Sequence, residues 1–245
     1  MRKHESGKVQ LLAAESLRAL RGFMSGKEVL GLLKESGLHL TPVDLSRYVT
    51  GAVLPSTQRA LEIIQLLAEK NALGIAIKRS LVVDEKGVVN IPRVAYDTKI
   101  LRLAAARAYF EIGNSEIDKV LTAAVNGLPL AAFIADALDI DLCVARQEVE
   151  PGIDNYIEAK YFAPDPPRYT RLYLPSFMLG NSDRIIVVDD LLRTGRTLKA
   201  LYELASAKGA SVEAVLSLVA VGEEWRRAVP EGTKVIIGIE VKKSS

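Results

Sequence analysis

Two adjacent carboxylates and a short glycine-containing loop stand close together in the segment Ile185–Thr197. Asp189 and Asp190 follow four apolar residues, a run typical of a strand that is buried on both faces. The loop Thr194–Thr197 precedes a helical pattern, and its glycine, its two hydroxyls and the helix N-terminus favour a bound phosphate. The carboxylates would repel a phosphate but can accept hydrogen bonds from sugar hydroxyls. The segment therefore predicts a site for a sugar phosphate, with a plain strand-turn-helix as the alternative.

A second loop of small residues follows the predicted strand Lys119–Val125 and precedes the predicted helix Leu130–Leu138. Its residues are Ala124, Val125, Asn126 and Gly127. Alone this loop is a weak signal, because many strand ends have the same composition. Its place ahead of the predicted strand Leu142–Arg146 and of the acidic pair strengthens the interpretation as a second anion-binding loop.

Together these segments resemble the phosphoribosyl-diphosphate motif of type I phosphoribosyltransferases, over about residues 95–220. The resemblance implies that Asp189 and Asp190 contact the ribose hydroxyls of 5-phosphoribosyl-1-diphosphate and that Thr194–Thr197 holds its 5′-phosphate. It implies that the loop after Lys119–Val125 holds the diphosphate. Mg²⁺ is expected only with this ligand, and no metal site of the protein's own is predicted. The residues expected to bind the ligand are Asp189, Asp190, Arg193, Thr194, Gly195, Arg196, Thr197, Ala124, Val125, Asn126, Gly127 and Arg146.

Two departures from the family pattern argue against catalysis. The family often has a lysine close behind the position of Arg146, whereas Gln147 and Glu148 follow here. The stretch Glu148–Tyr173, where the enzymes have a mobile loop, carries four carboxylates before its first lysine, Lys160. Departing diphosphate gains negative charge that cations stabilise, so an acidic loop suits this step poorly. Ligand binding without turnover is the expectation, and no catalytic residue is assigned.

The order of predicted elements indicates an α/β fold behind an all-helical N-terminal part. From residue 119 onward strands and helices alternate, which favours a mainly parallel sheet with helices on both faces. Short strands are predicted at Ile75–Ile77, Leu81–Val83 and Val88–Ile91, with a hairpin turn at Asp84–Gly87. These patterns divide the chain into a helix-turn-helix domain, residues 1–73, and a phosphoribosyltransferase-like ligand-binding domain, residues 74–245.

The N-terminal part contains a candidate helix-turn-helix: a helix Glu28–Lys34, a turn at Gly37 and a helix Pro42–Thr50. Residues 1–70 carry ten Lys and Arg against seven Asp and Glu, which permits contact with nucleic acid. The segment Leu45–Ser56 resembles the recognition segment of Cro/repressor-type regulators. The residues expected to contact DNA are Thr41, Asp44, Ser46, Arg47, Tyr48, Thr50 and Arg59. A helical dimerisation or lid domain is the alternative.

Composition places the chain among ordinary globular proteins. Of its 245 residues 49% are hydrophobic and 25% charged, and the net charge is +2. One cysteine, Cys143, excludes an internal disulfide, and the absence of a long apolar run or signal sequence indicates a cytoplasmic protein. The main hypothesis is a homodimeric DNA-binding transcription regulator that senses phosphoribosyl diphosphate or a related nucleotide of nucleotide metabolism. The alternative is an active purine or pyrimidine phosphoribosyltransferase with an accessory N-terminal domain.

Overall fold

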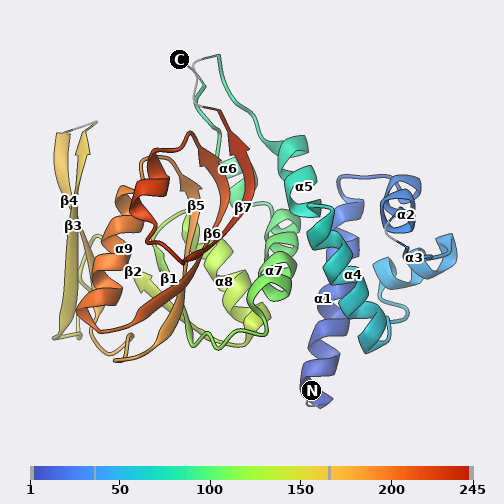
Figure 1. Ribbon diagram of the computed structural model, residues 1–245, viewed down its shortest axis with the longest axis horizontal. Helices are drawn as coiled ribbons and strands as arrows, with labels where there is room; N and C mark the ends of the chain where they lie inside the picture. The colour runs from blue at the N-terminus through green and yellow to red at the C-terminus, as the bar shows by residue number, and fades with distance from the viewer. Residues whose placement is uncertain (1–2, 36, 86, 165–166, 243–245) are drawn as a thin grey trace.

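A computed structural model describes residues 3–35, 37–85, 87–164 and 167–242. Helices occupy the chain as far as residue 112, and a parallel sheet, its covering helices and a hairpin follow (Figure 1). The first helices are α1 (Lys3–Arg21), α2 (Gly26–Lys34), α3 (Pro42–Thr50), α4 (Thr57–Glu69), α5 (Ala72–Ser80), α6 (Pro92–Ala95) and α7 (Thr98–Ile112). None of the helices in the described ranges is long and apolar enough to cross a membrane.

The α/β part begins with β1 and ends with β7. Its elements are β1 (Lys119–Ala123), α8 (Gly127–Leu138), β2 (Asp141–Ala145), β3 (Tyr156–Pro164), β4 (Pro167–Pro175), β5 (Arg184–Leu192), α9 (Arg196–Ala207), β6 (Ser211–Val221), the 3₁₀ helix η1 (Glu224–Ala228) and β7 (Lys234–Val241). Five strands form one sheet in the order β2-β1-β5-β6-β7, and every neighbouring pair is parallel. The predicted α/β fold with a mainly parallel sheet is confirmed.

Helices cover both faces of this sheet, which explains the uninterrupted apolar run of β5. Ile186 and Val188 belong to the apolar core shared with α7 and α8, whereas Ile185 and Val187 belong to the core shared with α9. The antiparallel hairpin β3–β4 occupies the long stretch after β2 and packs against α9, on its side away from the sheet (Figure 1). All four side chains of the apolar run Ile185–Val188 are buried, because helices cover each face of the sheet.

The region after residue 71 corrects the first of the predicted strands. Ile75–Ile77 lies inside α5, where Asn71 caps the helix by accepting a hydrogen bond from the backbone of Gly74 at 3.1 Å. The expectation of a strand there is wrong because the apolar side chains follow helical spacing and pack against β7 at Gly238. Further on, Val83 and Val89 form a single antiparallel bridge around a turn, so the predicted hairpin exists only as a bridge.

The N-terminal helices share one apolar core with the α/β part. α1 packs along α4 on one side and along α7 on the other (Figure 1). Buried Leu17 and Leu20 of α1, Ile77 of α5 and Ile100 of α7 belong to the same cluster. The predicted boundary between residues 73 and 74 falls within α5, which itself contacts α4, α7 and β7. The division into two domains stays a prediction.

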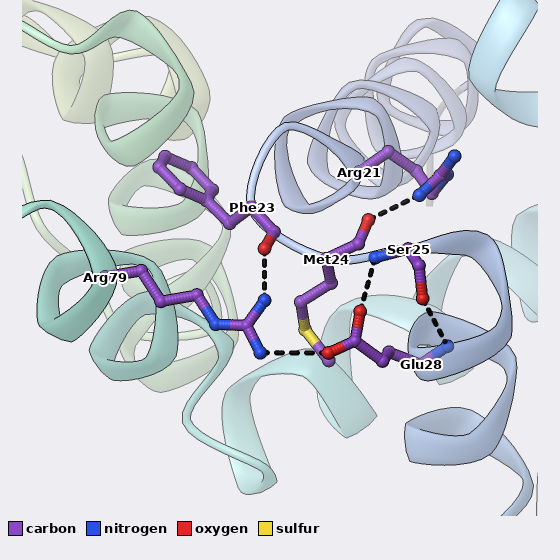
Figure 2. A network of polar contacts seen from close by, with 6 residues as sticks. All are labelled: Arg21, Phe23, Met24, Ser25, Glu28 and Arg79. Carbon is purple, nitrogen blue, oxygen red and sulfur yellow. Dashed lines mark hydrogen bonds and ion pairs between the residues drawn. The ribbon is translucent and has the colours of Figure 1, made fainter.

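A polar network fixes the turn between α1 and α2 (Figure 2). Ser25 and Glu28 form a capping box, in which the Ser25 hydroxyl accepts from the Glu28 amide and the Glu28 carboxylate accepts from the Ser25 amide. Arg79 of α5 donates to the same carboxylate at 3.0 Å and to the carbonyl of Phe23. These hydrogen bonds, first of all those from Ser25, lower the pKa of Glu28 from 4.5 to about 2. The ionised carboxylate therefore connects the α1–α2 turn to α5.

The lowered pKa predicts a pH-dependent contribution of Glu28 to stability. A carboxylate whose pKa is lower in the folded than in the unfolded chain stabilises the fold above its unfolded pKa and loses this contribution as the pH falls. Glu28→Gln should therefore lower the urea midpoint at pH 7, and the difference from wild type should shrink between pH 4.5 and about 2. Glu35→Gln, which changes an exposed carboxylate at the other end of α2, is the matched control. A difference that stays constant over this pH range would count against the network.

Candidate active site

β5 carries the acidic pair to the carboxyl-terminal end of the sheet, the edge at which open α/β sheets bind ligands. The strand extends through Leu192, so Asp189 and Asp190 lie on it rather than in the following loop. Both are buried, with exposed fractions of 9% and 7%. The expectation of two carboxylates at the end of a buried strand agrees with this geometry. The alternative, a plain strand-turn-helix with solvent-facing aspartates, does not agree with the burial of these two side chains.

The acidic pair is electrostatically costly without a ligand. Burial raises the pKa of Asp189 well above its ordinary value, and the neighbouring charge of Asp190 raises it further. Burial likewise raises the pKa of Asp190. The Asp190 amide donates to a carboxylate oxygen of Asp189 at 3.0 Å. A ligand that donates hydrogen bonds or carries positive charge would relieve the cost of burying the two carboxylates.

The loop between β5 and α9 has the geometry of an anion site. Gly195 adopts a left-handed conformation with φ of 75° and immediately precedes α9, so the helix N-terminus has no side-chain cap there. Thr194, Arg196 and Thr197 are half-buried around it. The first amides of a helix lack acceptors within the helix and carry partial positive charge. A phosphate is the ligand that these amides and the two hydroxyls suit best.

Close packing beneath this loop requires glycine at position 195. A Cβ atom placed there would lie 2.7 Å from the Cβ of Ala228 and 3.1 Å from the backbone of Trp225. Trp225 itself is fully buried, and its indole nitrogen donates to the carbonyl oxygen of Gly222 at 3.0 Å. The 3₁₀ helix η1 thus supports the loop from below and fixes its path.

The second predicted loop, Ala124–Gly127, lies beside the acidic pair because β1 and β5 are neighbours. A Cβ at Gly127 would lie 2.7 Å from the Thr122 hydroxyl and 3.5 Å from the Cα of Asp189, so glycine permits this close approach. Val125 is 72% exposed, and the peptide between Ala124 and Val125 is cis. The structure therefore brings the two predicted ligand loops to one edge of the sheet.

Tyr96 is a residue of this site that the sequence did not reveal. It follows α6, is 49% exposed, and its hydroxyl donates to the side-chain oxygen of Asn126 at 2.6 Å. A single aromatic residue outside both motifs gives no sequence signal for such a contact. The bond connects the segment before α7 to the second loop.

The two arginines predicted to bind the ligand have different surroundings. Arg193 is exposed in the loop between β5 and α9. Arg146 follows β2, exchanges backbone hydrogen bonds of 2.9 and 2.7 Å with Tyr173, and forms an ion pair with Glu150. Glu158, another carboxylate of the acidic stretch, pairs with Arg171 across the hairpin at 3.6 Å. Arginine partners therefore offset part of the negative charge that the sequence places here.

The residues expected to contact DNA mostly use their polar atoms within the chain. Thr41 and Asp44 form the capping box of α3, and the Thr50 hydroxyl donates to the carbonyl of Ser46 at 2.9 Å. Arg59 pairs with Glu62 at 3.6 Å. Tyr48 packs against the core, and Arg47 is exposed. The predicted helices exist, but their hydrogen bonds serve local structure.

Comparison with known protein families shows to which family the chain belongs. The phosphoribosyl transferase domain family matches residues 95–240, which is more than half of the chain and includes both loops and the acidic pair. The chain belongs to this family. A protein of Methanopyrus kandleri named hypoxanthine/guanine phosphoribosyltransferase is 30% identical over 150 residues, covering 59% of this chain and 76% of the relative. A protein of the same name from Methanotorris igneus is 28% identical over 151 residues, covering 59% and 78%.

Solved structures agree on the fold of this domain. An adenine phosphoribosyltransferase from Rhodothermus marinus superposes with a TM-score of 0.61 at 19% identity, covering 69% of this chain and 98% of that one. A second, from Thermoanaerobacter pseudethanolicus, gives a TM-score of 0.55 at 22% identity, covering 67% and 98%. At these identities the likeness shows the fold alone.

These comparisons correct the main functional hypothesis. The expectation of a DNA-binding transcription regulator is wrong, because the relatives that match the chain are named as phosphoribosyltransferases. They support neither a DNA partner nor a homodimer, and they do not confirm a helix-turn-helix domain at the N-terminus. The alternative hypothesis, an active phosphoribosyltransferase, is the better supported one.

Proposed function

We propose that the chain is an active phosphoribosyltransferase that transfers the 5-phosphoribosyl group of phosphoribosyl diphosphate to a purine base. The observation that carries the proposal is the buried acidic pair beside an uncapped helix N-terminus, at the carboxyl edge of the sheet. The purine class follows from the relatives, which are named for hypoxanthine and guanine. Nucleotide metabolism is the setting that this activity implies.

Phosphoribosyl diphosphate, the donor of the phosphoribosyl group, fits the site in one orientation. Its 5′-phosphate lies against the amides at the start of α9 and the hydroxyls of Thr194 and Thr197. Its ribose hydroxyls donate to Asp189 and Asp190, which cannot face a phosphate without repulsion. The diphosphate then lies along the loop Ala124–Gly127, next to Asp189. Arg193 is exposed beside the 5′-phosphate position and adds a positive charge there.

In the reaction a ring nitrogen of the purine forms a bond to C1 of the ribose as the bond from C1 to the diphosphate oxygen breaks. Diphosphate leaves with the electron pair, and the purine loses a proton to solvent. Positive charge develops on the ribose, directly above the two carboxylates. Fixed negative charge at this place stabilises the transition state more than the ground state. Asp189 and Asp190 are therefore assigned both binding and electrostatic stabilisation.

Mg²⁺ suits the donor set of this site. The described residues contain no cluster of three or more His, Cys, Asp or Glu that could hold a metal ion. Mg²⁺ is commonly held by one or two carboxylates together with substrate phosphates and water. Asp189 or Asp190 would help to hold the ion when the substrate is bound. When bound, the ion neutralises charge on the departing diphosphate.

The purine assignment is tested by product identification. The protein is incubated with phosphoribosyl diphosphate, Mg²⁺ and, separately, hypoxanthine, guanine, adenine, uracil or orotate, and nucleotides are separated by chromatography. We expect a nucleoside monophosphate from at least one purine and none from the pyrimidines. A pyrimidine nucleotide as the main product would overturn the purine assignment.

Tyr96 gives a milder prediction for the same site. Tyr96→Phe removes the hydrogen bond to Asn126, and a bond of this kind contributes about 0.5 to 1.5 kcal/mol. The KM for phosphoribosyl diphosphate should rise roughly 2- to 13-fold, with a smaller change in kcat, because the bond orients the diphosphate loop. Asn126→Ala should have a similar effect, and the double variant should be little worse than either single one. Additive effects would show that the two side chains act separately.

A further inference from the structure

A cavity of about 450 Å³ lies between α2 and α3, at the end of α1. It lies in the part of the molecule farthest from the β3–β4 hairpin, with α1 and α4 between it and the sheet (Figure 1). It is therefore separate from the site at the carboxyl edge. Binding sites for small molecules have volumes of about 300 to 1,000 Å³ and mostly apolar walls with a few polar groups.

The walls of this cavity are largely apolar. α2 contributes Leu30, and α3 contributes Pro42, Leu45 and Val49. Leu45 is buried, whereas Leu30 and Val49 remain half-buried because the two helices do not close over them. The hydroxyls of Ser46 and Thr50 lie at the rim. An apolar ring or a short chain would cover Leu30 and Val49 and remove them from water.

Positive charge gathers at one end of the cavity. Arg21 and Lys27 line it together with Gly26, the first residue of α2. The Arg21 guanidinium lies 3.8 Å from the position that a Cβ on Gly26 would take, and its bond to the Met24 carbonyl uses one of its five N–H donors (Figure 2). The N-terminus of α2 lies at the same end, where the Ser25 hydroxyl already accepts from the Glu28 amide.

The nearest acidic residue of α2 does not neutralise this charge. Glu28 turns its carboxylate to the Ser25 amide, at 2.6 Å, and to Arg79, at 3.0 Å (Figure 2). Among the described residues, those that line the cavity include no Asp or Glu. One end of the cavity is thus cationic and the rest apolar.

We propose that this cavity binds a small organic anion with an apolar body. Its anionic group lies against Arg21, Lys27 and the start of α2, and its body lies against Leu30, Leu45 and Val49. Charge complementarity and volume both select this class: a purely apolar molecule would leave the cations unpaired, and inorganic phosphate would leave the apolar wall exposed. The proposal does not depend on the transferase activity.

The probe for the test is 1-anilinonaphthalene-8-sulfonate, an aromatic molecule with one sulfonate, titrated into the full-length protein while its fluorescence is followed. Arg21→Gln with Lys27→Gln should weaken binding about tenfold or more, because charge-assisted hydrogen bonds are lost. Ser46→Trp, which fills the rim and leaves the cations in place, should abolish it. Lys34→Gln with Arg47→Gln removes the same charge from exposed positions of α2 and α3 outside the cavity and should have little effect.

Competition by octanoate or by guanosine monophosphate then distinguishes a carboxylate from a phosphate source. Circular dichroism of each variant establishes that the helices remain folded. Equal affinity of the wild type, the Arg21 and Lys27 variant and the Ser46→Trp variant would overturn the proposal. A loss as large in the Lys34 and Arg47 control would also overturn it, because attraction by the overall charge would then explain the binding.

Discussion

Replacing Asp189 and Asp190 together by asparagine should lower kcat/KM for phosphoribosyl diphosphate by at least about a hundredfold. Each hydrogen bond from a ribose hydroxyl to a charged acceptor contributes about 1.5 to 3 kcal/mol, and two such bonds are weakened. The developing positive charge on the ribose also loses its counter-charge. Initial rates over a range of donor concentrations measure the effect. Asp136→Asn with Asp141→Asn, exposed residues in the last turn of α8 and at the start of β2, opposite the carboxyl edge of the sheet, is the control.

Removing these carboxylates should lower activity, but it should not lower the stability of the unliganded protein at neutral pH. Because burial raises the pKa of Asp189, the folded chain binds more protons than the unfolded chain above the ordinary pKa of 3.8. The free energy of unfolding of the unliganded protein should therefore fall as the pH rises from about 3.8 to the raised pKa. Asp189→Asn should flatten this dependence and leave the protein at least as stable at pH 7. A variant that lost both activity and stability at neutral pH would show that the carboxylates serve the fold instead of the ligand.

Gly195→Ala should destabilise the protein and disrupt the phosphate loop together. A left-handed conformation costs an alanine about 1 to 2 kcal/mol, and overpacking against Ala228 and Trp225 adds about 1 to 3 kcal/mol. We expect a loss of about 2 to 5 kcal/mol in the free energy of unfolding, measured in urea. The KM for the donor should rise at the same time, because the amides at the start of α9 shift.

Gly232 supplies a matched control for this substitution. Its φ is 85°, yet a Cβ there would meet no atom within 4 Å. Gly232→Ala therefore carries the conformational cost alone, about 1 to 2 kcal/mol, and should leave the KM unchanged. If the two variants were equally stable and equally active, packing beneath Gly195 would have no role in holding the loop.

The elements nearest to the site were the most predictable from sequence, for a physical reason. A strand buried on both faces requires a continuous apolar run, and the helix after Gly195 requires a residue that tolerates positive φ. Both constraints are local, so β5 and α9 appear in the sequence nearly as the structure has them. The hairpin β3–β4 has no such local signature in the sequence, and it packs against α9, which lies further along the chain.

Other features depend on contacts that no local pattern contains. α5 reads as a strand because its apolar residues alternate over three positions, and only its packing on β7 shows the helix. The bond between Tyr96 and Asn126 joins residues thirty positions apart. Ser25 and Thr41 cap α2 and α3 where the predicted helices begin, yet a cap specifies where a helix begins and not what the helix binds. The mistaken regulator hypothesis came from that last step.

The acidic stretch after β2 is less negative in the folded chain than its composition suggests. Its charge suggested binding without turnover, but Glu150 and Glu158 are paired with Arg146 and Arg171. Their carboxylates therefore repel a diphosphate less than their number in the sequence implies. Two of the four carboxylates before Lys160 are thus paired with arginine, while Gln147 and Glu148 still follow Arg146 where the family often has a lysine.

The most direct test of the proposed transfer is the initial rate of diphosphate release with phosphoribosyl diphosphate and Mg²⁺, measured with and without guanine or hypoxanthine. We predict release that requires the purine, saturates with it, and falls at least about a hundredfold in the Asp189→Asn, Asp190→Asn variant. Release at the same slow rate with or without either purine, in wild type and variant alike, would contradict a phosphoribosyltransferase at this site.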